Sequence, residues 1–166
     1  MATVFSSSAP EAFNREYVLN SPVNGSRIDL EVLNAPLYEA GMWGPAMAFR
    51  YSGHTVFAPA DCLIEAAPGS GYEISLKTSY GLKVWINLLP LRHHLMGEKC
   101  ERLVKPGQKV RTGTPLLHFQ PQWLRQQGFD PYGVLCVRNG DKCKAVVASH
   151  LQQFVAAEDP LIHIYI

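Results

Sequence analysis

The clearest candidates for chemistry lie in one stretch, LKVWINLLPLRHHLMGE, at residues 82–98. Asn87 lies in a strand-like run, and the adjacent pair His93 and His94 follows six residues later. A neutral imidazole can act as a nucleophile near pH 7. Adjacent residues of an extended segment point to opposite sides, so at most one of the two histidines can face a common site. We therefore ask whether one of these histidines or Asn87 decides the chemistry of this stretch.

The remaining histidines and the cysteines do not form a ligand set. His118 lies in an alternating run, and His54 lies in the turn SGHTV, where ordinary hydrogen bonding explains both. The chain has no CxxC pair and no His-x-His, and zinc sites usually need such spacing. We expect no metal site and no cofactor, and we expect reduced thiols at four scattered positions: Cys62, Cys100, Cys136 and Cys143.

Composition argues for a compact domain without a strongly charged partner. Of the 166 residues, 47% are hydrophobic and 17% are charged, and the net charge is +1. This balance gives no basic patch for nucleic acid or an anionic membrane. Residues 1–17 do not resemble a signal peptide, and no apolar run approaches the ~20 residues of a membrane span. We expect a cytoplasmic protein with no nucleic-acid partner and no membrane insertion.

Short apolar runs separated by Gly, Pro and Asn predict an all-β domain. In the run 72–78, Ile74, Leu76 and Thr78 alternate with more polar residues, and TSYGL predicts a hairpin turn to the next run. The predicted strands lie at 46–51, 55–60, 62–67, 72–78, 82–89, 115–120, 132–139 and 161–166.

Helical signals are few. PQWLRQQGF at 121–129 predicts one short helix that ends at Gly128, and ASHLQQFVAA at 148–157 predicts a second with Ser149 as its cap. In VKPGQKVRTGTPL, at 104–116, two glycine turns enclose a short strand. Residues 1–15 are small and polar, so we expect a flexible tail before a single domain at 16–166.

Four segments together resemble a known family. They are SPVNG at 21–25, FAPADCLI at 57–64, GEKCERLVKPGQKVRTGTPLLHF at 97–119 and DPLIHIYI at 159–166. They resemble the glucose-type IIA component (EIIA type-1 domain) of the bacterial phosphoenolpyruvate:sugar phosphotransferase system. The GE…GQxVxxG spacing is the more specific part, because Cys62 replaces the glycine of APxDG. The resemblance runs from Tyr17 to Ile166. It implies an antiparallel β-sandwich or flattened barrel, the duplicated hybrid motif of glucose-permease IIA, with one or two short helices.

Members of this family carry a phosphoryl group on a histidine, from the carrier protein HPr to the B domain of a sugar transporter. A second histidine stabilises the phosphoryl oxygens. The nucleophile segment ELFVHFG corresponds to KVWINLL, which places Asn87 at the nucleophile position, and NHxFSI corresponds to GYEISL, which places Tyr72 at the second. The two aspartates that meet an arginine of HPr correspond to Ala35 and Leu91. The zinc site that some IIA proteins build with a partner uses the same two histidines, so the resemblance implies its loss.

The chemistry of these replacements argues against phosphoryl transfer. The lone pair of an amide nitrogen is delocalised into the carbonyl, so Asn87 is no nucleophile. The phenol of Tyr72 has an ordinary pKa near ~10, and its phosphate ester is too stable to be passed on. Asn87 therefore becomes the residue that decides the function, and we expect no catalytic residue.

The apolar ring around the family's site is retained at five positions: Leu37, Tyr38, Met42, Trp43 and Trp85. Aromatic side chains and methionine on one face are typical of a protein-binding surface, with Arg92 and Lys99 as candidate rim charges. The alternative is that these residues, Trp85 above all, are simply core.

Three functions remain open from the sequence. The first is a degenerate IIA-like domain, a monomer that carries no phosphate and binds a protein partner through the apolar face, with a component of the phosphotransferase system or a transporter as candidate partners. The second is a phosphocarrier of sugar uptake that uses His93 or His94 as an atypical acceptor. The third is a small-ligand-binding domain with Tyr72 and Asn87 as polar lining.

Overall fold

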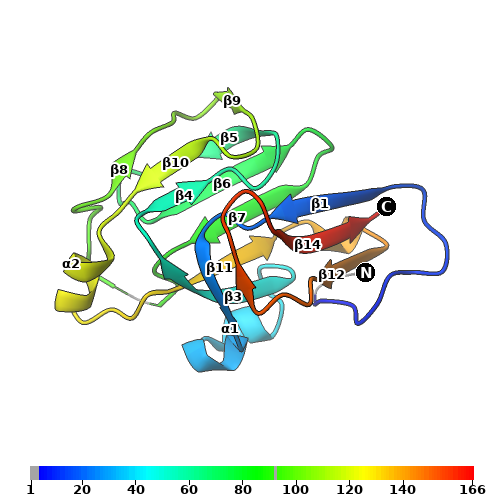
Figure 1. Ribbon diagram of the computed structural model, residues 1–166, viewed down its shortest axis with the longest axis horizontal. Coiled ribbons are helices and arrows are strands. Elements are labelled where there is room, and N and C mark those ends of the chain that lie inside the picture. Colours follow the sequence, from blue (N-terminus) through cyan, green and yellow to red (C-terminus); the bar gives the residue numbers. More distant parts are fainter. Residues whose placement is uncertain (1–3, 92) are drawn as a thin grey trace.

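The computed structural model describes residues 4–91 and 93–166, which form three antiparallel sheets (Figure 1). The largest sheet has eight strands in the order β13–β2–β3–β11–β7–β6–β5–β9. Its strands are β2 (Asn24–Ile28), β3 (Ala46–Ser52), β5 (Cys62–Ala66), β6 (Glu73–Thr78), β7 (Lys83–Asn87), β9 (Lys109–Val110), β11 (Tyr132–Val137) and β13 (Gln153–Phe154).

Two three-stranded sheets and a few helical turns complete the fold. One small sheet is ordered β1–β14–β12 and the other β4–β10–β8. Their strands are β1 (Glu16–Asn20), β4 (Thr55–Phe57), β8 (Glu101–Arg102), β10 (Pro115–His118), β12 (Ala145–Ala148) and β14 (Pro160–Tyr165). The helices are α1 (Pro36–Glu39) and α2 (Pro121–Gln126), with 3-10 turns η1 (Leu30–Leu33) and η2 (Gly140–Lys142). This architecture confirms the predicted all-β class.

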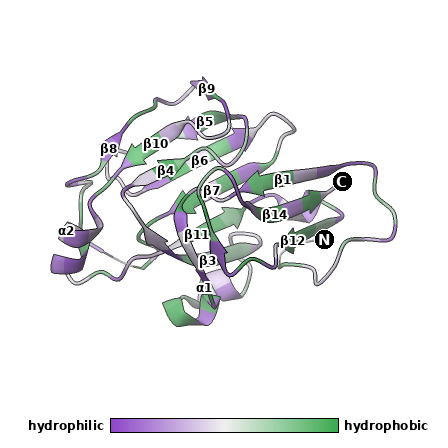
Figure 2. Cartoon of the chain, in the orientation of Figure 1, coloured by the Kyte–Doolittle hydropathy of each residue, from purple (hydrophilic) through white to green (hydrophobic). Residues whose placement is uncertain are grey.

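The main core lies between the large sheet and the two small ones. It joins Ile64, Ile74 and Ile86 of the large sheet to Leu116 and Ile162 of the small sheets, all fully buried. A second, smaller cluster lies on the outer face of the large sheet, under η1 and α1. Figure 2 shows α1 largely in the hydrophobic colour although it lies at the outside of the fold, whereas α2 is hydrophilic. The large sheet is therefore apolar on both faces near α1.

The β6–β7 hairpin determines which side chains reach each face. In its turn the Gly81 N–H donates to the Thr78 carbonyl at 3.0 Å, in line with the hairpin turn that the sequence predicts. Ile74 pairs with Ile86 on the core face, and Glu73 pairs with Asn87 on the outer face, because neighbours on an antiparallel ladder share one side of the sheet. The hairpin thus presents Asn87 on the same side as α1.

The glycine turns predicted at 104–116 enclose the short edge strand β9. Gly107 and Gly113 have φ values of +88° and +85°, which L-residues other than glycine rarely adopt. Both turns are therefore fixed by backbone geometry, as expected.

The prediction of a helix at 148–157 is wrong. This segment holds β13, whose Phe154 pairs with Gly25 of β2, and the Ser149 N–H donates to the Leu161 carbonyl at 2.9 Å. Pairing with distant strands outweighs the weak local helix preference. The helix predicted at 121–129 is confirmed as α2, followed by Gly128 with φ +92°.

Residues 4–15 run along the sheet that contains β12 and β14. Ser6 N–H donates to the Val146 carbonyl at 2.9 Å, and the Phe13 ring packs edge-on against Tyr165 at 4.8 Å. The flexible tail and the domain boundary at residue 16 stay predictions.

Candidate functional site

Asn87 ends β7 between two neighbouring strands of the large sheet. It pairs with Glu73 of β6 on one side and Val134 of β11 on the other, and it is only 7% exposed. Its Oδ1 accepts a hydrogen bond from the Leu89 N–H at 2.9 Å, which fixes the turn that follows the strand. The amide therefore has a defined structural role at the strand end.

Three aromatic side chains lie together next to Asn87 on this outer face. The Trp85 ring stacks with Tyr38 at 6.1 Å and meets Trp43 edge-on at 5.7 Å. The guanidinium of Arg138 lies over both indoles, 5.6 Å from Trp43 and 5.9 Å from Trp85, in cation–π geometry. Trp43 and Trp85 remain half-buried, so the outer edge of this cluster reaches the surface.

The surface above the cluster is made by two exposed apolar side chains. Leu37 of α1 is 55% exposed and Met42 is 68% exposed, and the Met42 N–H donates to the Leu37 carbonyl. We call Leu37, Met42, Trp43 and Trp85 the apolar face. Tyr38 was expected there too, but it is buried, because the single turn of α1 directs it inward against Trp85.

Burial also changes the chemistry of Tyr38. Burial raises the pKa of its hydroxyl to about 12, the Cys136 thiol acts in the same direction, and the Asn87 amide opposes them. The hydroxyl is therefore neutral at physiological pH. Of the two positions expected for lost aspartates, Ala35 is buried at the start of α1 and Leu91 is exposed after β7. Arg92 lies outside the described residues. Lys99 is exposed, and it lines a cavity to which none of the apolar-face residues contributes.

Tyr72 belongs to the main core and not to the apolar face. It is fully buried, and its hydroxyl donates to the Glu98 carbonyl. Its φ is +67°, a left-handed conformation that costs energy for a residue with a side chain and therefore requires the packing that surrounds it. Burial raises the pKa of the phenol to about 12, with smaller contributions from Cys100 and Glu98. The side chain is a neutral, packed phenol.

The two adjacent histidines differ in their surroundings. His93 is half-buried, with its ring edge-on to Tyr72 and to Phe129, each at 6.1 Å, whereas His94 is exposed. The Leu95 N–H donates to His93 Nδ1 at 3.2 Å, which leaves the ring proton on Nε2 when the imidazole is neutral. Burial lowers the pKa of His93, and the neighbouring His94 lowers it further. His93 therefore packs with Tyr72.

Glu73 is a member of the site that the sequence did not single out. It faces Asn87 across the β6–β7 ladder, and burial raises the pKa of its carboxyl group. Its charge also raises the pKa of Tyr38, which places it on the same outer face. The period-two pattern of 72–78 together with the hairpin turn could have placed it opposite Asn87. A half-buried carboxylate next to Asn87 would repel an incoming phosphoryl group.

The described residues hold no group of three or more His, Cys, Asp or Glu side chains suited to a metal ion. The four cysteines are free thiols, three of them buried. In the same part of the chain, no helix has the length and apolar character that crossing a membrane requires.

Fold and site together define a β-sandwich domain with a shallow apolar surface at the end of a central strand. A model of the phosphoenolpyruvate-dependent sugar phosphotransferase system EIIA 1 family matches residues 17–143. The chain belongs to this family, which confirms the class that the sequence resembles.

Known relatives agree with this assignment. The chain is 29% identical over 135 residues to the PTS system glucose-specific EIIBCA component of Corynebacterium glutamicum, a match to 81% of this chain and 20% of the relative. It therefore spans only about a fifth of that protein's length. It is 24% identical over 151 residues to the PTS system glucose-specific EIIA component of Halalkalibacterium halodurans, which covers 90% of this chain and 87% of the relative.

A solved structure supports the fold. Glucose permease IIA from Mycoplasma capricolum matches with a TM-score of 0.74 at 16% identity, over 90% of this chain and 96% of that chain. At this identity the match shows the fold alone, and it confirms the predicted β-sandwich of the glucose-permease IIA type.

Proposed function

We propose that this chain is a docking domain of the sugar phosphotransferase family that binds a cytoplasmic partner protein through the apolar face and carries no phosphoryl group. The observation that carries the proposal is Asn87. At the strand end where the family resemblance expects a nucleophilic imidazole, the chain holds an amide whose Oδ1 is bonded to the Leu89 N–H. An amide at this position cannot accept and release a phosphoryl group.

The surroundings of Asn87 support the same conclusion. Phosphoryl transfer depends on positive or hydrogen-bond-donating groups that stabilise the charge of the transferred group. Here the Glu73 carboxylate faces Asn87, and Tyr72, at the second expected histidine position, packs in the main core with its hydroxyl on the Glu98 carbonyl. The site therefore places a carboxylate where a phosphocarrier needs groups that stabilise negative charge.

An atypical acceptor at His93 fits the geometry poorly. The lone pair of Nδ1 accepts the Leu95 N–H, and the ring is packed between Tyr72 and Phe129. A phosphoryl group on Nδ1 would have to displace that hydrogen bond. His94 is exposed, and among residues 4–91 and 93–166 no hydrogen bond fixes the orientation of its ring.

The apolar face has the features of a binding surface. Met42 and Leu37 are exposed, and they adjoin two indoles whose orientation is fixed by each other and by Arg138. Rigid aromatic side chains beside flexible methionine are typical of the centre of a protein interface. Because Ala35 and Leu91 provide no carboxylate for an arginine of HPr, we expect a transporter B domain, and not HPr, to be the partner.

The docking prediction is that the double variant Leu37→Asp/Met42→Asp weakens binding to a purified B domain encoded in the same genome by about tenfold or more. Two charges would have to be buried against an apolar partner surface, and loss of hot-spot contacts has effects of this size. Titration calorimetry measures the dissociation constant.

Val155→Asp is the matched control. Val155 is 48% exposed, similar to Leu37, and it lies next to β13, away from the apolar face. We expect its dissociation constant to equal that of the wild-type chain. An equal loss in both variants, or no binding of any B domain, would argue against docking through this face.

A further inference from the structure

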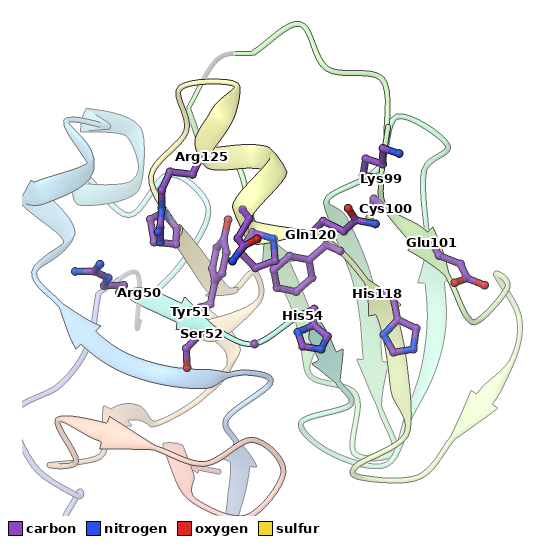
Figure 3. Close-up of a pocket in the computed structure, with 15 residues that line it drawn as sticks. Arg50, Tyr51, Ser52, His54, Lys99, Cys100, Glu101, His118, Gln120 and Arg125 are labelled. Atoms are coloured by element: carbon purple, nitrogen blue, oxygen red, sulfur yellow. The ribbon is translucent and has the colours of Figure 1, made fainter.

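A cavity of about 1000 Å³ opens at a place that neither Asn87 nor Tyr72 lines. It lies between the end of β3, the β3–β4 turn, the end of β10, α2 and the segment 99–101 (Figure 3). This volume is in the range of small-molecule sites in proteins. The sequence did not predict the cavity, because its walls come from segments that are far apart in the chain.

The cavity collects positive charge in a chain whose net charge is only +1. Arg50, Lys99 and Arg125 line it, together with the imidazoles of His54 and His118. Figure 3 shows Arg50 and Arg125 at one side of the opening and Lys99 at the other. Among the described lining residues, Glu101 has the one carboxylate, and Figure 3 shows it at the far edge, directed away from the two arginines.

These cations are available to a ligand. Within residues 4–91 and 93–166, no hydrogen bond or ion pair engages the side chains of Arg50, Lys99 and Arg125, and the ion pair described there joins His163 to Glu16. Arginine presents a planar group that binds phosphate or carboxylate oxygens with two parallel hydrogen bonds. Two unpaired guanidiniums at one side of a cavity are therefore suited to an anion with more than one oxygen.

The floor of the cavity is apolar and well ordered by its contacts. The rings of Tyr51 and Phe119 meet edge-on at 5.1 Å, and Phe119 is buried. The Tyr51 hydroxyl donates to the Leu88 carbonyl at 3.2 Å, and His118 Nδ1 is bonded to Thr55 Oγ1 at 3.0 Å. These contacts hold the floor of the cavity rigid, and a ligand meets only the edges of the two rings, since Tyr51 is 3% and Phe119 2% exposed.

We propose that this cavity binds a small organic polyanion, a phosphate ester or a polycarboxylate, through Arg50 and Arg125 at one side and Lys99 at the other. The site is separate from the apolar face and does not depend on the docking function proposed above. A negative result for docking through the apolar face therefore does not affect the proposal for the cavity, and a negative result for the cavity does not affect the docking proposal.

The test is titration calorimetry of the full chain with ribose 5-phosphate and with citrate, and with uncharged ribose as the control ligand. We expect saturable binding of at least one of the two anions and none of ribose. Arg50→Gln/Arg125→Gln should raise the dissociation constant of that anion by about tenfold or more, since charged hydrogen bonds are lost. Lys109→Gln, which removes an exposed charge on β9 outside the cavity, should leave it unchanged.

A second readout places the ligand in the cavity. Cys100 lines the cavity and is half-buried, whereas the other three cysteines are buried, so a thiol reagent at mildly alkaline pH should label Cys100 first. The bound anion should slow this labelling in the wild-type chain and not in Arg50→Gln/Arg125→Gln.

The outcomes separate clearly. Binding of ribose 5-phosphate alone assigns the phosphate ester, and binding of citrate alone assigns the polycarboxylate. No binding of either anion, or equal affinity in the double variant and in Lys109→Gln, would overturn the proposal, as would unchanged labelling of Cys100 at saturating anion.

Discussion

Gly44→Ala is expected to destabilise the domain by about 3–5 kcal/mol, at the upper end of the range for single substitutions. Gly44 has φ +84°, and a Cβ at this position would lie 2.0 Å from the backbone oxygen of Val137. A backbone oxygen within a sheet cannot move aside as a flexible side chain can. The substitution should therefore separate the loop that carries Trp43 from the end of β11, which Arg138 follows, and so disturb the contact of Arg138 with the two indoles.

Gly81→Ala is the matched control for Gly44→Ala. Gly81 has a similar φ of +89°, but no atom lies within 4 Å of the position that its Cβ would take. The unfolding free energy of this variant should therefore fall only by the cost of the left-handed conformation, about 1–2 kcal/mol. Urea unfolding followed by tryptophan fluorescence measures both free energies. Equal losses in the two variants would show that the contact between Gly44 and Val137 is not as close as described.

Tyr72→Ala is expected to cost about 3–5 kcal/mol of unfolding free energy, since it removes a large and fully buried ring from the main core. Tyr72→Phe keeps the ring and removes only the hydrogen bond to the Glu98 carbonyl, so it should cost about 1 kcal/mol. Thermal or urea unfolding of the two variants measures the difference.

The comparison of these two variants tests whether Tyr72 is structural. If Tyr72→Ala were no less stable than Tyr72→Phe, the ring would not fill the core. That result would contradict a structural role for Tyr72 and favour its role as polar lining of a ligand site. The left-handed φ of +67° makes this a sensitive test, because the packing of the ring must offset that strain.

Much of the fold could be predicted from the sequence because local patterns and tertiary structure agree there. Ile74 and Leu76 alternate with the more polar Glu73, Ser75 and Lys77, and the turn at Gly81 aligns them with Ile86 and Val84. The exception at 148–157 has a physical reason. Phe154 gains a strand partner in β2 that is distant in sequence, and no local pattern signals that contact.

The site was only partly predictable. The sequence resemblance identified Asn87, Leu37 and Met42, but it did not predict that Tyr38 is buried, because the direction of a one-turn helix depends on what it packs against. Glu73 was missed because its role depends on the register with β7. The basic cavity was missed because Arg50 and Arg125 lie far apart in the chain.

The most direct test of the central claim is phosphoryl transfer to the wild-type chain. The protein is incubated with phosphoenolpyruvate, enzyme I and HPr, and its intact mass is measured under mildly alkaline conditions, with a IIA protein that has both histidines as the positive control. We predict that the control gains one phosphoryl group and this chain gains none. An acid-labile gain of one phosphoryl group on this chain, lost in His93→Ala or His94→Ala, would contradict the account and identify it as a phosphocarrier.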